Sequence, residues 1–170
     1  MKKVILYIFS AVLLGSIMVG CMPKDELTYT GPTVVEFKNH LQGFNTTKLA
    51  AMGVSSTGQT MVSRRVNVNT RGTDTIYVQL VGPQSASATE IGFAVETSST
   101  AVAGTHYNFR PVGANKLTIP ANSSTGYILV DMIPGSIAGT ATFPLRVTLT
   151  GNGTVAPSAN YKTFTLTLGN

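Results

Sequence analysis

Cysteine and tryptophan are nearly absent from this chain of 170 residues, which has one cysteine, Cys21, and no tryptophan. A single cysteine cannot form an internal disulfide, and a domain of about 150 residues buries roughly 68–70% of its unfolded surface without needing one. Zinc would require clustered Cys or His ligands, but the two histidines, His40 and His106, are far apart in the sequence. We therefore expect one domain with no disulfide, no metal and no cofactor.

Charged residues are also few: Asp, Glu, Lys and Arg make up 11% of the chain, and the net charge is +5. The basic residues are scattered, and only Arg64 and Arg65 adjoin each other beyond the first few residues. Proteins that bind nucleic acids usually carry a basic stripe or cluster, so we expect no nucleic-acid partner.

Patterns that signal catalysis are missing. Neither histidine lies in a nucleophile motif such as Gly-x-Ser-x-Gly, and the glycines within 151–153 join two strands instead of opening the helix that a phosphate loop needs. We expect His106 to pack in a turn beside Tyr107 and His40 to lie in a loop. The chain is predicted not to be an enzyme, and a glycoside hydrolase with two facing carboxylates stays open as an alternative.

The first twenty residues are typical of a secretory signal. Lys2 and Lys3 precede the uncharged run 4–19, which is shorter than the roughly 20 residues of a membrane-spanning helix. The following Gly20-Cys21 pair resembles the lipobox of bacterial lipoproteins, with Met18 where Leu is usual. The resemblance implies that residues 1–20 are removed, that Cys21 is acylated, and that lipid ties the protein to a membrane through a tether of residues 21–32.

A charged triplet follows the cysteine. Lys24, Asp25 and Glu26 resemble the surface-export signal of Bacteroidota lipoproteins, a Lys followed by two acids. Met22 stands where an Asp often signals retention in the inner membrane. The resemblance implies a lipid-anchored protein of the outer membrane that faces the cell exterior; the alternative is the charged start of a plain tether.

Residues 33–170 show the two-residue period of β-strands. Apolar and polar side chains alternate in most of the predicted strands, which are 34–37, 62–69, 76–81, 91–96, 116–119, 127–132, 143–149 and 163–168. Within 39–60 the pattern is ambiguous, and 48–52 fits a helical turn or a strand. This alternation gives each sheet one solvent-exposed face and one apolar face, and two apolar faces can pack against each other. We therefore predict an all-β, immunoglobulin-like antiparallel β-sandwich of about 7–9 strands. A closed barrel is the alternative.

One stretch resembles Calx-beta-type repeats. The segment 101–107 (AVAGTHY) is followed by 117–121 (LTIPA) and by the strand 127–130 (YILV). The same signature occurs in immunoglobulin-like domains of Bacteroidota surface lipoproteins, many of which sit beside glycan-uptake systems. His106 stands where calcium-binding members have Asp, and Asp131 lacks a second acid beside it. Calcium takes six to eight oxygen ligands, so we expect no calcium site.

Tyrosines are the remaining candidates for ligand contact. An aromatic ring in an alternating strand belongs more often to the core than to a sugar platform. Tyr77 lies opposite the apolar face of Ile76, Val78 and Leu80, and Tyr107 ends the Calx-beta-like segment. We name Tyr77 and Tyr107 as possible ligand contacts.

These observations predict a non-catalytic binding or structural module at the cell surface, accessory to glycan capture, with a glycan or a surface protein as its partner. The first alternative is an adhesin or surface-assembly subunit, which should show an unpaired strand edge or an apolar patch. The second is a minor hydrolase, which should bring two carboxylates, or a His and a hydroxyl, into one pocket. A glycan binder should show coplanar exposed tyrosines.

Overall fold

The computed structural model describes residues 29–170. The signal segment, Cys21 and the triplet of Lys24, Asp25 and Glu26 lie outside the described residues, so the anchor and the surface address stay predictions. Over the described range, no helix is both long enough and apolar enough to cross a membrane.

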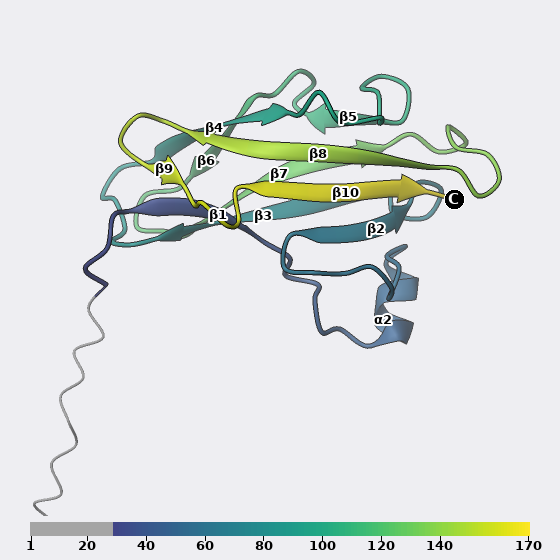
Figure 1. Cartoon of the computed structure of the whole chain (residues 1–170), viewed down its shortest axis with the longest axis horizontal. Helices are drawn as coiled ribbons and strands as arrows, with labels where there is room; N and C mark the ends of the chain where they lie inside the picture. Colours follow the sequence, from purple (N-terminus) through teal and green to yellow (C-terminus); the bar gives the residue numbers. More distant parts are fainter. Residues whose placement is uncertain (1–28) are drawn as a thin grey trace, which may run out of the picture.

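The described chain forms two five-stranded sheets packed face to face (Figure 1). Sheet A has the strand order β5-β7-β3-β1-β9, and sheet B has the order β2-β10-β8-β4-β6. The strands are β1 (Val34–Lys38), β2 (Ser63–Asn67), β3 (Thr73–Val81), β4 (Thr89–Val95), β5 (Tyr107–Arg110), β6 (Lys116–Ile119), β7 (Thr125–Met132), β8 (Thr142–Gly151), β9 (Ala156–Pro157) and β10 (Thr163–Gly169). The predicted all-β sandwich is confirmed.

The two-residue period of the sequence builds the core. In β3, Ile76, Val78 and Leu80 are buried and alternate with half-buried neighbours; β10 repeats the pattern with Phe164, Leu166 and Leu168. Each such side chain contributes about 1.5–3 kcal/mol when it leaves water. The inward faces of both sheets therefore meet in one apolar core.

Two strands and two pairings differ from the prediction. Strand β5, with four residues, and strand β9, with two, were not predicted from the sequence. Strands β2 and β10 pair in parallel, as do β1 and β9, whereas the sequence predicted an antiparallel sandwich. Alternation fixes the face that each residue occupies, but it does not identify the neighbouring strand.

The ambiguous segment contains the short helix α2 (Thr46–Ala51). Asn45 caps it, because the Asn45 side chain accepts a hydrogen bond of 2.8 Å from the Lys48 N–H. Leu49 is the buried residue of the helix, and the chain then runs past β2, where Val54 forms a bridge with Val66. This segment therefore covers the outer edge of sheet B.

Candidate functional site

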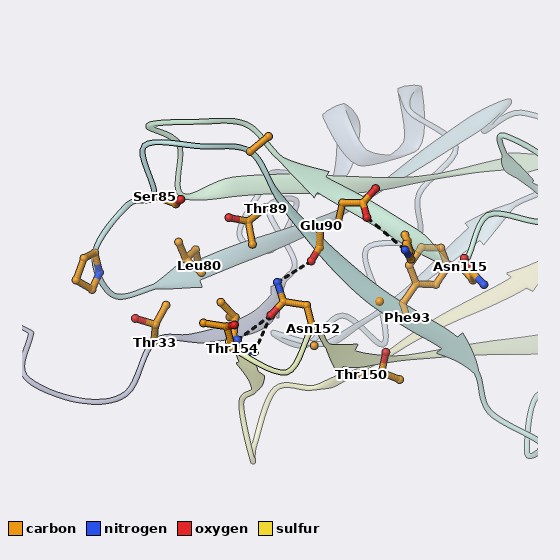
Figure 2. A pocket seen from close by; sticks show the side chains of 16 residues that line it. Thr33, Leu80, Ser85, Thr89, Glu90, Phe93, Asn115, Thr150, Asn152 and Thr154 are labelled. Carbon is orange, nitrogen blue, oxygen red and sulfur yellow. Dashed lines mark hydrogen bonds and ion pairs between the residues drawn. The ribbon is translucent and has the colours of Figure 1, made fainter.

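A groove of about 1060 Å³ opens at the end of the sandwich where the chain enters β1 (Figures 1 and 2). Its walls are the β3–β4 connection at 82–88, the start of β4 and the turn after β8 at 151–155, and Thr33 completes the rim. The volume is that of a site for a ligand of several sugar or amino-acid units. This groove is the candidate functional site.

The turn after β8 is held in place by Gly151 and Asn152. Gly151 has a φ of +73°, and a Cβ there would lie 2.3 Å from the Val155 carbonyl oxygen, so the position requires glycine. Asn152 Oδ1 accepts hydrogen bonds from the N–H groups of Thr154 (3.1 Å) and Val155 (2.8 Å), while its Nδ2 donates to the Glu90 carbonyl at 2.9 Å. The turn is thereby tied to β4 across the groove.

A second glycine keeps the groove open. Gly92 precedes a register shift between β4 and β8, which is typical of a β-bulge. A Cβ at position 92 would lie 2.5 Å from Thr150 Oγ1. A larger residue would therefore displace Thr150 or enter the groove.

The polar part of the groove lining consists mainly of neutral hydrogen-bonding groups. Hydroxyl and amide side chains come from Thr33, Ser85, Thr89, Asn115, Thr150, Asn152 and Thr154. Its two charged side chains, Glu90 and Lys116, form an ion pair of 3.3 Å with the side chains 65% and 62% exposed. Because the pair has no net charge, the lining suits a neutral, hydroxyl-rich ligand.

The lining supplies one carboxylate, Glu90, and no histidine. Glycoside hydrolysis needs a second carboxylate that flanks the bond, and nucleophilic catalysis of the Ser-His type needs a histidine base. The groove can therefore bind and orient a ligand, but its own side chains do not assemble either constellation.

Asp131 and Glu96 each have a separate partner outside the groove. Asp131 forms an exposed pair with Arg110 and accepts a hydrogen bond from Thr73, which lowers the pKa of Asp131. The pKa of Glu96 is lowered chiefly by a hydrogen bond from Thr148. Within residues 29–170 there is no group of three or more His, Cys, Asp or Glu side chains that could hold a metal ion.

Asp74 belongs to a buried network between the sheets. Arg64 on β2 donates from Nε to Asp74 at 3.1 Å and from Nη1 to Asn39 Oδ1 at 3.1 Å, and Arg71 Nε donates to Asp74 at 2.7 Å. The side chains of Arg64 and Asp74 are fully buried, and the Arg64 guanidinium also lies over the Phe164 ring. These groups hold the two sheets together and offer no surface to a ligand.

Of the two tyrosines named from the sequence, Tyr107 is buried. Its side chain is 2% exposed and packs edge-on against Phe109, so the prediction of a ligand contact at Tyr107 is wrong. Burial also raises the pKa of Tyr107. The alternation of Tyr107 and Phe109 with Asn108 and Arg110 in β5 is the signal that could have shown its inward direction.

Tyr77 lies half-buried on the outer face of sheet A, beside Tyr127 on β7. The two ring centroids are 6.5 Å apart with planes tilted by 51°, and the His40 ring lies 4.2 Å from Tyr77 on its other side. The rings are not coplanar, so they do not form the flat sugar platform that we set as the criterion for a tyrosine site.

The two histidines lie where the sequence placed them. His106 is buried in a turn, accepts a hydrogen bond of 2.9 Å from the Val102 N–H at Nδ1, and stacks on Phe143. His40 follows β1 in a turn, and its buried Nδ1 has no hydrogen-bond partner among the described residues. Neither histidine contacts the groove lining.

The free edges of the sheets are short or covered. Strands β5, β6 and β9 have four, four and two residues, and the segment around Val54 covers β2. Large exposed apolar side chains, such as Val112 and Val102, lie on separate loops. Short edges protect a sheet against pairing with other chains, so these edges do not favour the adhesin alternative.

The groove-lining residues were not identified from the sequence. The signal that could have found them is the composition of the turns at one end of the sandwich: 82–88 (GPQSASA) and 151–155 (GNGTV) carry no charge and are rich in Ser, Asn and Thr. The two turns lie at the same end of the sandwich because of the order of the strands in the sheets. The alternation of side chains does not predict that order.

No family model and no curated protein matches the chain. Among solved structures, the chain is similar to the apo-form Calx CBD1 domain, with a TM-score of 0.53, 13% identity, and coverage of 81% of this chain and 96% of that one. CBD12 from CALX1.2 gives a TM-score of 0.49 at 16% identity over 62% and 40% of the two chains. A family 123 glycoside hydrolase from Clostridium perfringens gives 0.42 at 6% identity over 82% and 27%. The first likeness shows that the fold is Calx-beta-like.

Proposed function

We propose that this chain is a lipid-anchored, non-catalytic binding module of the outer membrane, facing the cell exterior, whose groove captures a neutral glycan. The observation that carries the proposal is the lining of the groove, which has seven hydroxyl or amide side chains and an ion pair with no net charge. Sugars present many hydroxyl groups and little charge, and they are recognised through such hydrogen-bonding groups.

The absence of a second carboxylate from the lining supports binding without hydrolysis. Glu90 is also engaged by Lys116 at the rim, where both side chains are mostly solvated. A glycan held here would contact hydrogen-bonding groups on both walls of the groove, with Leu80, Phe93 and Val155 among the apolar residues of the lining.

The position of the groove suits a tethered protein. Thr33, on the rim, directly follows the proposed tether of residues 21–32. A fully extended chain spans at most about 3.3–3.6 Å per residue, so the groove would stay within roughly 40 Å of the membrane. A glycan captured there would lie close to any uptake protein in the same membrane.

The test uses the full-length lipidated chain in detergent micelles on an array of neutral, uronate-containing and sulfated oligosaccharides. Ala88 lines the groove, and Ala86, on the same loop, does not. We expect Ala88→Trp to fill the groove and to abolish binding of neutral oligosaccharides, and Ala86→Trp to bind as the unmodified chain does. Equal binding by the two variants, or no binding of any neutral oligosaccharide, would contradict the proposal.

A further inference from the structure

Of three arginines close together in the chain, two bind a single carboxylate. Arg64 and Arg71 bind the two oxygens of Asp74, with Nε–oxygen distances of 3.1 Å and 2.7 Å. Arg65 points to the opposite face of β2, and its guanidinium has no ion pair or hydrogen bond with any residue in 29–170. This region of the molecule therefore has an excess of positive charge and one guanidinium without a partner.

The unpartnered guanidinium occupies a defined place. It lies against Gly169 on the adjacent strand β10, where a Cβ would be 3.0 Å from Arg65 Nη2 and 3.2 Å from Nε. Gly169 does not have a positive φ, so its backbone would accept other residues. The missing side chain at 169 instead leaves the space in which the Arg65 guanidinium lies.

Arg65 also lines a pocket of about 430 Å³ at the end of the sandwich opposite the groove. Asn67 Oδ1 accepts from the Asn69 N–H at 2.8 Å, and Asn170 Oδ1 accepts from Asn69 Nδ2 at 2.6 Å. The Nδ2 groups of Asn67 and Asn170 are left without acceptors among the described residues. Arg65 and the two amides thus offer hydrogen-bond donors to the pocket, which an oxygen-rich ligand can accept.

The acids among the described residues are engaged elsewhere or lie on other strands. Asp74 is held by Arg64 and Arg71, and none of Glu36, Glu90, Glu96 and Asp131 lines this pocket. A guanidinium presents a planar fork that matches a carboxylate with two parallel hydrogen bonds. We propose that this pocket binds an organic carboxylate with several hydroxyl groups, such as a sugar acid, with its carboxylate on Arg65 and its hydroxyls on the amides of Asn67 and Asn170.

The test measures binding of sodium glucuronate to the full-length chain by titration calorimetry, with glucose as the neutral counterpart and sulfate and phosphate as other anions. Arg65→Gln should weaken glucuronate binding at least about tenfold, because a charge-assisted pair is lost. Gly169→Ala should also weaken it, because the new methyl group displaces the guanidinium. Arg65→Lys should retain part of the affinity, since it keeps the charge but loses the fork.

Arg146→Gln is the matched control. Arg146 is another arginine on the outer face of sheet B, but it donates to Ser98 Oγ at 3.2 Å and does not line this pocket. Its loss should leave glucuronate binding unchanged, and so should Ala88→Trp, which fills the groove at the other end. Binding of glucose as tight as that of glucuronate, unchanged binding in Arg65→Gln, or tighter binding of sulfate or phosphate would overturn the assignment.

Discussion

Arg64 is a fully buried cation, and its neutralisation depends on one carboxylate, Asp74. Removing one member of a buried pair leaves a charge without compensation, at a cost of about 3–5 kcal/mol. Asp74→Asn should therefore lower the free energy of unfolding by about that amount, measured by urea denaturation at pH 7. The loss is large because Arg64 and Arg71 would both lose their acidic partner.

The exposed pair of Arg110 and Asp131 provides the comparison, since 57% of the Arg110 side chain is exposed. Exposed pairs contribute about 0–1 kcal/mol, so Asp131→Asn should cost less than roughly 1 kcal/mol. Similar losses in the two Asp→Asn variants would show that burial of the Arg64–Asp74 pair is not what sets its importance.

His40 should make stability depend on pH. Burial, followed by the charge of Arg64, lowers the pKa of His40 from 6.5 to about 4 in the folded chain. Between these values the unfolded chain binds a proton that the folded chain excludes, so the free energy of unfolding falls as the pH is lowered from about 6.5 to about 4. Urea denaturation at pH 7 and pH 5 should show a smaller loss for His40→Gln than for the unmodified chain.

The comparison of pH 7 with pH 5 also limits the contribution of the two carboxyls whose pKa is perturbed. Hydrogen bonds from Thr148 and from Thr73 lower the pKa of Glu96 and of Asp131 from ordinary values of 4.5 and 3.8, which lie below this range. An NMR titration of the His40 ring gives the pKa directly. A value near 6.5, or identical pH dependence in the His40→Gln variant, would refute this explanation.

How far single residues could be predicted from the sequence depends on whether their strand was recognised. Arg64 alternates in phase with Val66 and Val68, so its inward direction could be predicted from the pattern despite its charge. Its partner Asp74 sits on another sheet, and nothing in the pattern places the two together. Tyr107 was misassigned because β5 was not predicted as a strand, although Tyr107 and Phe109 alternate there with Asn108 and Arg110.

At the scale of the element, the turn after β8 determines one wall of the groove. Alanine in a left-handed conformation costs about 1–2 kcal/mol, and at Gly151 a Cβ would also collide with the Val155 carbonyl oxygen at 2.3 Å. Gly151→Ala should therefore lower the unfolding free energy by more than about 2 kcal/mol and weaken glycan binding. Thermal unfolding and the oligosaccharide array measure the two effects.

Gly153 in the same turn is the control. It has a φ of +86°, but no atom lies within 4 Å of the position of its Cβ. Gly153→Ala should cost only the conformational term of about 1–2 kcal/mol and should leave the groove intact. If Gly153→Ala destabilised the protein as much as Gly151→Ala, the steric role of Val155 would be refuted.

Strands were predictable where apolar and polar side chains alternate between clear turn signals, including the four-residue β6. The predicted strand at 116–119 coincides with β6, and the strand predicted at 163–168 lies within β10. Pro144 lies near the start of the central strand β8, where β4 has already ended. A residue without an N–H is tolerated there because no neighbouring strand needs its donor.

At the scale of the whole molecule, the anchor is a prediction that rests on Cys21. Two or three acyl chains hold a protein on a membrane, whereas one alone binds marginally. Cys21→Ser should therefore move the chain from the membrane fraction to the soluble fraction, as measured by fractionation and immunoblotting. Recovery of the Cys21→Ser chain in the membrane fraction would contradict lipidation at this residue.

The arrangement of the two sites is also a property of the whole molecule. The groove lies at the end where the chain enters β1, and the Arg65 pocket lies at the opposite end, beside the last residue of β10 (Figure 1). The order of the strands in the two sheets puts the groove and the Arg65 pocket at opposite ends. The sequence pattern predicted the sandwich but did not predict that order. Sites at opposite ends can be occupied independently, which is why variants in one serve as controls for the other.

The most direct test of the central claim, that this sandwich binds its ligand outside the cell, is protease shaving of intact cells followed by immunoblotting, with a periplasmic protein as the integrity control. We expect the chain to be degraded while the control survives, and we expect replacement of Lys24, Asp25 and Glu26 by alanine to protect it. Survival of the unmodified chain until the outer membrane is opened would contradict the account, because the domain would then work in the periplasm.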